Sequence, residues 1–274
     1  MMRSHSDDPT KLLALAEACA KEKALNDANP SQQEQLPIWA DAVRGVPNGV
    51  LRSALFGAIA RGRRPFLQRE TIAALDGITI RQTGPRLDQA DLDVWEQCLH
   101  LARVSGLGVR IEFTARGFMA SIGRAGGGKN IEWLKNALAR LAASVVEISV
   151  RGRGAYFGAM IHDGTMSESG RYVIQINPAI VALYGVDGWT GVDWAQRQAL
   201  RGQPIAQWLH GYYSSHRQAF PARAETLQRL CGSAAVNPAD FARDLRDSLM
   251  LLGAATGWQC GMDQEGMIRV SRGE

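Results

Sequence analysis

The chain has 274 residues, a formal net charge of +4 and a pI near 9.0. This length can bury a sizeable core and usually forms two domains, and the modest basic excess fits nucleic-acid binding as well as many enzymes. The four cysteines lie far apart without a CxxC pair, which excludes a recognisable zinc site or disulfide framework. With no apolar run of about 18 residues and no export signal, we expect a soluble cytoplasmic protein without membrane contact.

The first 70 residues predict little core. Residues 1–35 predict a loosely attached tail with one helix candidate at residues 11–25. Residues 36–70 contain scattered prolines and glycines, which predict an extended arm. Within residues 44–86, eight arginines stand against two acidic residues. We interpret the arm as a basic segment whose Arg61, Arg63 and Arg64 contact DNA phosphates, and a solubilising loop is the alternative.

A repeated pattern follows a strand at residues 78–80 and a helix at residues 92–104. The first copy runs from FTAR at residues 113–116 through a short helix and a glycine-rich turn to a helix at residues 131–141. The second runs from FPAR at residues 220–223 through a similar stretch to a helix at residues 241–252. Short helix, turn and longer helix with strands close behind outline a winged helix-turn-helix.

The remaining segments complete two modules. Strands at residues 145–150, 156–161 and 172–176 are expected to form the first wing and a small sheet, with a helix start at Asn177 and Pro178. A turn-rich connection at residues 184–191 predicts the domain boundary, and residues 194–216 predict a long, weakly interrupted helix. Residues 258–260 and 267–270 predict the second wing. We therefore expect an α+β fold with tandem winged-helix domains at residues 36–190 and 191–274.

The two longer helices supply candidate DNA contacts. In the first, Lys129, Trp133, Asn136 and Arg140 lie opposite the apolar face. In the second, the outward positions include Arg243 and Arg246. Arginine and amide side chains match the acceptors and donors of base edges, although a charged face is often only solvated.

One phosphate-loop pattern is nearly complete. Residues 123–130, GRAGGGKN, match GxxxxGK[ST] at every specified position but the last, where Asn130 replaces Ser or Thr. The preceding residues 114–122 have helical spacing, whereas a phosphate loop follows a buried strand. We therefore prefer a turn that places Lys129 and Asn130 near a DNA phosphate, and a nucleotide hydrolase is a weaker alternative. The YYSSH segment at residues 212–216 is expected to pack a helix rather than supply a nucleophile.

Longer motifs identify a family. Residues 46–48 (VPN), 52–56 (RSALF), 84–95 (GPRLDQADLDVW), 212–216 (YYSSH) and 227–233 (LQRLCGS) closely resemble the TrfA-type replication initiators of broad-host-range plasmids. The likeness runs from about residue 36 to the C-terminal end. It implies two winged-helix domains that bind direct repeats of double-stranded DNA in a plasmid origin, open the duplex and help to load host replication proteins, including the initiator and helicase.

The resemblance also implies site residues and an oligomeric equilibrium. Monomers would initiate replication and dimers would repress it, with no covalent chemistry, cofactor or metal. The family's peptide for the sliding clamp is not matched, because residues 35–39 read QLPIW, so clamp contact is doubtful. A dimeric winged-helix repressor on a palindrome is the alternative function. The complete candidate DNA-binding set is Arg243, Arg246, Ser233, Arg223, Lys129, Asn130, Trp133, Asn136, Arg140, Arg61, Arg63, Arg64 and Arg269.

Overall fold

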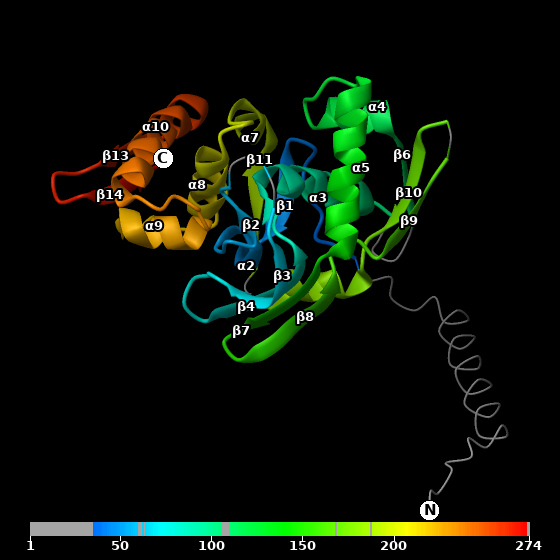
Figure 1. Cartoon of the computed structure of the whole chain (residues 1–274), viewed down its shortest axis with the longest axis horizontal. Coiled ribbons are helices and arrows are strands. Elements are labelled where there is room, and N and C mark those ends of the chain that lie inside the picture. The colour runs from blue at the N-terminus through cyan, green and yellow to red at the C-terminus, as the bar shows by residue number, and fades with distance from the viewer. Residues whose placement is uncertain are drawn as a thin grey trace, which may run out of the picture. The chain divides into compact units, whose positions relative to one another are not determined.

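A computed structural model describes residues 35–59, 62, 64–105, 110–167, 169–186 and 188–272 (Figure 1). The predicted helix at residues 11–25 lies outside these ranges, as do Arg61 and Arg63. The described residues all belong to the unit Glu34–Glu274.

The first part of this unit mixes short strands with helices, of which α3 and α5 are the longest (Figure 1). In chain order the elements are β1 (Val43–Pro47), α2 (Asn48–Leu51), β2 (Phe56–Gly57), β3 (Phe66–Ile72), β4 (Ile78–Pro85), β5 (Leu87–Asp88), α3 (Gln89–Ala102), β6 (Arg110–Thr114), α4 (Ala115–Ser121), α5 (Gly128–Ala143), β7 (Val145–Val150), β8 (Arg153–Ala159), β9 (Asp163–Met166), β10 (Arg171–Gln175), η1 (Pro178–Val181) and α6 (Ala182–Val186).

The second part is mainly helical and ends in a hairpin. Its elements are β11 (Trp189–Asp193), α7 (Trp194–Ala199), α8 (Pro204–Ser214), β12 (Ala222–Arg223), α9 (Ala224–Cys231), α10 (Pro238–Thr256), β13 (Gln259–Met262) and β14 (Met267–Ser271). The predicted helix at residues 194–216 is therefore two helices, because Gly202 has a φ of +85° and Pro204 begins α8.

Side chains set the starts of the helices that matter for function. Asp88 and Asp91 form a reciprocal capping box at the start of α3. Thr114 accepts a hydrogen bond from the Gly117 amide at the start of α4, and Asn237 caps α10 next to Pro238. These residues stop the preceding extended segments and fix where each helix begins.

The repeated sequence pattern folds as one repeated element order. A helix, a strand, a short helix, a longer helix and a hairpin occur as α3, β6, α4, α5, β9 and β10, and again as α8, β12, α9, α10, β13 and β14. The two three-stranded sheets have the matching orders β6-β10-β9 and β12-β14-β13. The predicted short helix, turn and longer helix are thus confirmed in both copies, as is the hairpin after residue 257.

The predicted first wing was placed on the wrong strands. β7 and β8, at residues 145–159, complete a separate four-stranded sheet of order β3-β4-β7-β8. β4 pairs with β7 along its length, so that Ile80 lies opposite Ile148 and both are buried. The hairpin that pairs with β6 is β9–β10. The β7–β8 hairpin is therefore inserted between α5 and β9.

The predicted extended arm is also wrong, because residues 36–58 supply core. Trp39, Leu55 and Phe56 are buried, and β1 pairs with β11 along five residues. A Cβ atom at Gly45 would lie 2.4 Å from the Trp39 ring, so this strand needs glycine for its close approach. The Tyr184 hydroxyl donates to the Gly45 carbonyl at 2.9 Å. Within the predicted turn-rich connection at residues 184–191, Tyr184 is therefore packed in the core, and residues 189–191 belong to β11.

Two apolar clusters fill the interior. The first contains Trp95, Phe118 and Leu134, and the second contains Trp208, Leu227 and Phe241. Hydrogen bonds join the segments that carry the first cluster to those that carry the second. The Trp208 indole donates to the Ser53 carbonyl at 2.9 Å, and a guanidinium nitrogen of Arg86 donates to the Gly232 carbonyl at 2.8 Å.

A buried ionic cluster ties α7 and α8 to α3. The side chain of Arg197 on α7 is 1% exposed and lies 2.8 Å from Asp93 and 2.9 Å from Glu96, both on α3. Gln207 of α8 donates to Asp93 at 3.3 Å. Burial raises the pKa of Glu96 to about 7, although the charge of Arg197 opposes the shift. Folding therefore favours the protonated form of this carboxyl group.

Glu96→Gln should change how stability depends on pH. Because the folded pKa of Glu96 lies above its ordinary value of 4.5, this group costs stability progressively as pH rises from 4.5 to about 7. Over that window, the free energy of unfolding of the wild type should fall relative to the variant by up to about 3 kcal/mol. Urea unfolding at several pH values measures the difference.

Glu112→Gln is the matched control, since Glu112 is exposed and lies 3.8 Å from Arg171. Its profile should run parallel to that of the wild type. If the pH profile of Glu96→Gln also ran parallel to that of the wild type, Glu96 would have the same pKa in the folded and unfolded states.

Candidate nucleic-acid interface

The N-terminal end of α5 is a basic, glycine-rich surface. The turn from α4 includes Gly123, with a φ of +67°. Arg201 reaches this turn from the segment between α7 and α8 and donates to the carbonyls of Ile122 and Gly123. α5 begins after Gly127, which offers no side-chain cap, and its first turn contains no acidic residue. The free amides and dipole of such a helix end favour an anion.

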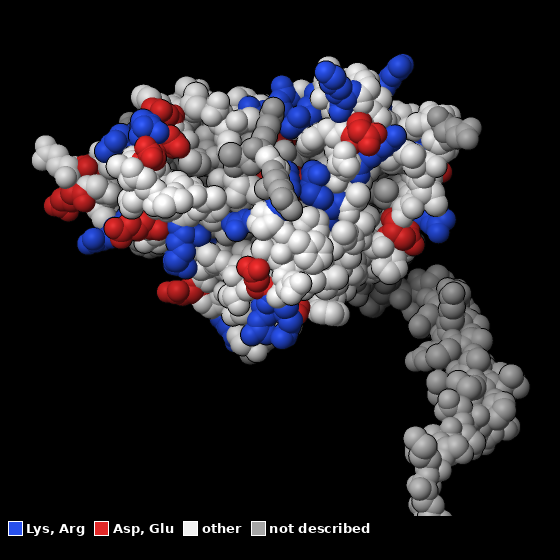
Figure 2. Space-filling model, in the orientation of Figure 1, with Lys and Arg blue, Asp and Glu red and all other residues white. Residues whose placement is uncertain are grey.

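Further cations surround this turn. The Arg116 side chain packs against Gly126, and the Arg124 guanidinium lies over the Trp133 ring, 3.9 Å from its centroid. Lys129 is exposed in the first turn of α5. Figure 2 shows Lys and Arg side chains gathered over the end of α5 that lies beside α4. We call Arg116, Arg124, Lys129 and Arg201 the α5 basic cluster.

The exposed stripe of α5 differs from the predicted one. It consists of Lys129, Glu132, Asn136, Ala139 and Ala143. Lys129 and Asn136 lie outward as predicted. The stripe contains small alanines at its C-terminal end, which leave room for a close partner.

Three predicted contact residues on α5 and its turn already make contacts within the protein. Trp133 is half-buried against the first apolar cluster, and Asn130 donates to the Ala125 carbonyl at 2.9 Å. Arg140 turns toward α3. Helical spacing alone could not separate these flanking positions from the exposed stripe, because both lie outside the buried face.

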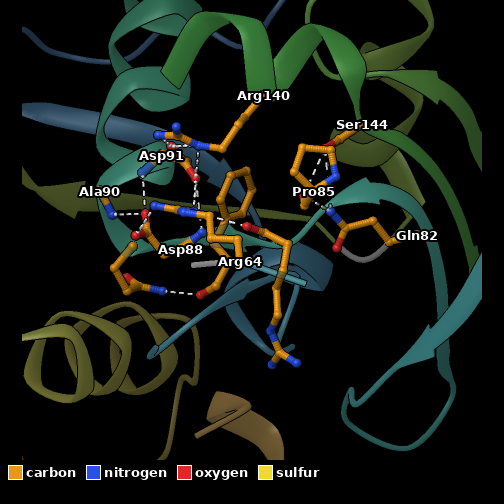
Figure 3. Close-up of polar contacts among 11 residues, drawn as sticks. Arg64, Gln82, Pro85, Asp88, Ala90, Asp91, Arg140 and Ser144 are labelled. Carbon is orange, nitrogen blue, oxygen red and sulfur yellow. Dashed lines mark hydrogen bonds and ion pairs between the residues drawn. The ribbon is translucent and has the colours of Figure 1, made fainter. Parts of the chain in front are cut away.

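Arg64 and Arg140 meet at one buried carboxylate (Figure 3). Asp91 has no exposed side-chain surface, and it lies 2.6 Å from Arg64 and 2.7 Å from Arg140. Asp88 beside it also pairs with Arg64. Burial raises the pKa of Asp91, and its hydrogen bonds to Arg140 oppose that rise. Both arginines therefore pair with a buried acid. Arg140 does not point outward as its helical spacing predicted, and Arg64 does not belong to an extended arm.

The predicted residues of the second copy remain near the surface. The Arg243 side chain is 65% exposed but lies between Asp240, at 3.2 Å, and Asp244, at 3.6 Å. Arg246 is exposed and has no ion pair within the described residues.

The other predicted residues lie around α9 and the hairpin. Arg223 is exposed at the start of α9. Arg269 on β14 pairs with Asp263 at 2.9 Å. The half-buried Ser233 hydroxyl accepts from the Ala235 amide at 3.3 Å. Two separate groups of candidates therefore result, one around α5 and one around α9, α10 and the hairpin.

The structure bears on the alternative chemistries. The GRAGGGKN turn follows helix α4, not the buried strand of a phosphate loop. The Tyr212 ring stacks on Trp208, with centroids 4.7 Å apart, so it packs α8 as expected. Among the described residues, no three His, Cys, Asp or Glu side chains are placed to hold a metal ion.

None of the described helices is both long and apolar enough to cross a lipid bilayer.

Comparisons with known proteins identify relatives. The family model described as TrfA protein matches residues 15–250. The chain is 29% identical over 232 residues to the plasmid replication initiator protein TrfA of Escherichia coli, a match that covers 78% of this chain and 59% of the relative. The chain therefore spans about three fifths of that relative's length.

Solved structures show the same fold at low identity. A crystal structure of domains 2 and 3 of RctB has a TM-score of 0.53 at 11% identity, covering 82% of this chain and 96% of that chain. A second structure of the same domains has a TM-score of 0.50 at 10% identity, covering 81% and 95%. The class is thus a mixed α/β protein with the fold of these RctB domains. The family match extends over most of the sequence, so the chain belongs to the TrfA family, as its motifs indicated.

Arg140→Gln should lower the free energy of unfolding by about 1 to 3 kcal/mol, because it removes a charged partner from the buried Asp91. Lys129→Gln on the same helix should change it by less than about 0.5 kcal/mol, since Lys129 is exposed. Urea unfolding compares the two. Unchanged stability together with weaker DNA binding in Arg140→Gln would instead assign Arg140 to DNA.

Proposed function

We propose that this protein initiates plasmid DNA replication by binding origin DNA in a sequence-specific manner, without covalent chemistry or a cofactor. Membership of the TrfA family and the relative's name, plasmid replication initiator protein, support this function. The exposed stripe of α5, with the basic cluster at its N-terminal end, is the observation that carries the DNA contact.

The repeated element order supports two winged-helix domains. In each copy the hairpin pairs with the strand that precedes the short helix, as β10 does with β6 and β14 with β12. The first apolar cluster ends at Trp194, and the second takes most of its residues from Leu200 onward. We therefore propose two domains, with the boundary expected at residue 190 moved to follow Trp194, because β11 pairs with β1. Residues 36–70 are built into the first domain rather than forming an arm.

α5 fits a major groove better than α10 does. Its exposed stripe offers a lysine, a carboxylate, an amide and alanines, and these match phosphate, cytosine, adenine and thymine methyl groups respectively. We assign Asn136 and Glu132 to bases. The α5 basic cluster contacts phosphates beside them.

The second domain contributes fewer cations through its helices. Arg243 is already neutralised by Asp240 and Asp244. Arg246 and Arg223 are the exposed arginines of the predicted set that can approach DNA there. Binding by both domains would cover adjoining stretches of one duplex, and the energy of that contact would distort the DNA and expose single strands.

The finer steps of initiation follow from the family. We propose that monomers bind direct repeats, recruit the host initiator and helicase, and are held inactive as dimers. Clamp contact is not part of the proposal, since Leu36 and Trp39 of the QLPIW segment are both buried.

Selection of bound sequences from a random duplex pool tests the function directly. A directional motif bound by a monomer supports an initiator on direct repeats. A palindrome bound by a dimer would instead indicate a repressor. Absence of any enrichment at low salt would contradict DNA recognition altogether.

Asn136→Ala should cost about 1 to 3 kcal/mol in binding the selected motif, because it removes a base-reading amide. Its effect on random DNA should be small. Lys129→Ala should weaken both duplexes alike and lower the salt slope by about 1, as expected for one phosphate contact. Fluorescence anisotropy titrations at several salt concentrations measure the binding free energy and the salt slope. If Asn136→Ala lost equal binding free energy on both duplexes, Asn136 would not be a base-reading residue.

A further inference from the structure

The second domain presents acidic groups where a winged helix usually meets DNA. The exposed residues of α10 include three aspartates, Asp240, Asp244 and Asp247, against two arginines. The turn between β13 and β14 adds Asp263 and Glu265. Carboxylates near phosphates are repelled. Neither the exposed side of α10 nor the hairpin turn therefore attracts the DNA backbone strongly.

A cationic groove lies at the other end of the same hairpin. It has a volume of about 690 Å³ and lies between residues 217–221 and strands β13 and β14. Its floor contains the cross-strand pairs Gln259 with Ser271 and Gly261 with Arg269. No acidic residue is among the described residues that line it, whereas three arginines are: Arg217, Arg269 and Arg272.

The three arginines of this groove are held differently. Arg272 donates to the carbonyls of Ser214 and Arg217, at 3.4 and 3.1 Å, and to that of His216. Arg269 shares its charge with Asp263 outside the groove. Arg217 is exposed and forms no ion pair with any residue that the structure describes. A surplus of positive charge therefore remains in the groove even after the Asp263 contact.

This composition is that of a phosphate contact surface. Guanidinium forks, amides and a hydroxyl are the side chains that bind phosphate and sugar oxygens of nucleic acid. Cys260 and Gly261 also line a second hollow of about 290 Å³, but its charged lining residues are Arg246 of α10 and the acidic Asp263. The surplus of positive charge is therefore a property of the first groove.

We propose that this groove binds the phosphodiester backbone of DNA, giving the second domain a contact that does not depend on the exposed face of α10. The proposal rests on the DNA-binding function above. It assigns Arg217 as a direct phosphate contact, with Arg272 and Arg269 shaping the site.

A substitution on the groove floor tests the proposal without removing any existing contact. A Cβ atom at Gly261 would meet nothing within 4 Å, so the strand can accept a side chain there. Gly261→Glu should weaken binding of a random-sequence duplex several-fold and lower the salt slope by about 1. Gly261→Gln, with the same shape and no charge, should bind like the wild type.

Arg217→Gln should give the same loss of salt slope as Gly261→Glu. Arg81→Gln is its control, because it removes one partly exposed arginine from β4, outside the groove. It should leave the slope unchanged. Equal effects from both arginine substitutions would mean that only net charge matters, and this would overturn the groove as a site.

Failure of the groove and failure of the DNA-binding function give different results. If the wild type does not bind the random duplex at low salt, both are wrong. If the wild type binds and Lys129→Ala weakens it, but Gly261→Glu and Gly261→Gln behave alike, only the groove proposal is overturned. It is also overturned if Gly261→Glu loses binding to polyglutamate while its DNA binding is unchanged, which would indicate an acidic protein partner.

Discussion

Helix α3 organises the unit through buried carboxyl groups, each of which lies against an arginine from another segment. Asp93 and Glu96 bind Arg197 from α7, and Asp91 binds Arg64 and Arg140. An unpaired charge in this interior would cost several kcal/mol, roughly the whole stability of a domain. The segments that carry these arginines are therefore fixed against α3, and the positions of β3, α5 and α7 follow.

The same pairing of arginines with buried groups changes how much of the chain's positive charge lies at the surface. Arg44 also points inward, where it donates to Gln97 at 2.8 Å and lies over the Trp194 ring. Arg86 is used at the contact with Gly232. Several of the arginines in residues 44–86 are therefore engaged in contacts inside the protein. The proposed attraction to DNA therefore rests on the cations left exposed, chiefly those at the start of α5 and in the groove beside β13.

Local signals in the sequence predicted the elements well and their partners poorly. The repeated pattern and apolar spacing located α4, α5, α9, α10 and the last hairpin. The pairing of β1 with β11 joins residues about 150 positions apart, and no local pattern encodes it. The proline- and glycine-rich sequence around Trp39 and Gly45 looked like an arm because close packing and extended loops favour the same small residues.

For the candidate site, too, the sequence predicted local features but not long-range contacts. Lys129 and Asn136 could be placed outward from helical periodicity. The inward turn of Arg140 depends on Asp91, and the Asp88 and Asp91 capping box was a signal that acids begin α3. Arg217 had no periodic context at all, because it lies in the loop after α8. The hydrogen bonds of Arg272 to the carbonyls of Ser214, His216 and Arg217 bring this loop beside the end of β14.

Polar contacts between the two apolar clusters also bear on DNA recognition. Apolar surfaces can slide over one another with little loss of contact energy. The hydrogen bonds of Arg197 to Asp93 and of Arg86 to Gly232, in contrast, form in only one relative position of the two parts. A rigid arrangement avoids the entropy cost of ordering two domains on binding. It also fixes the distance between the α5 stripe and the groove beside β13. The two contacts would then require a fixed spacing between their binding sites on the duplex. Insertion of base pairs between these sites would therefore remove the binding free energy of the second contact.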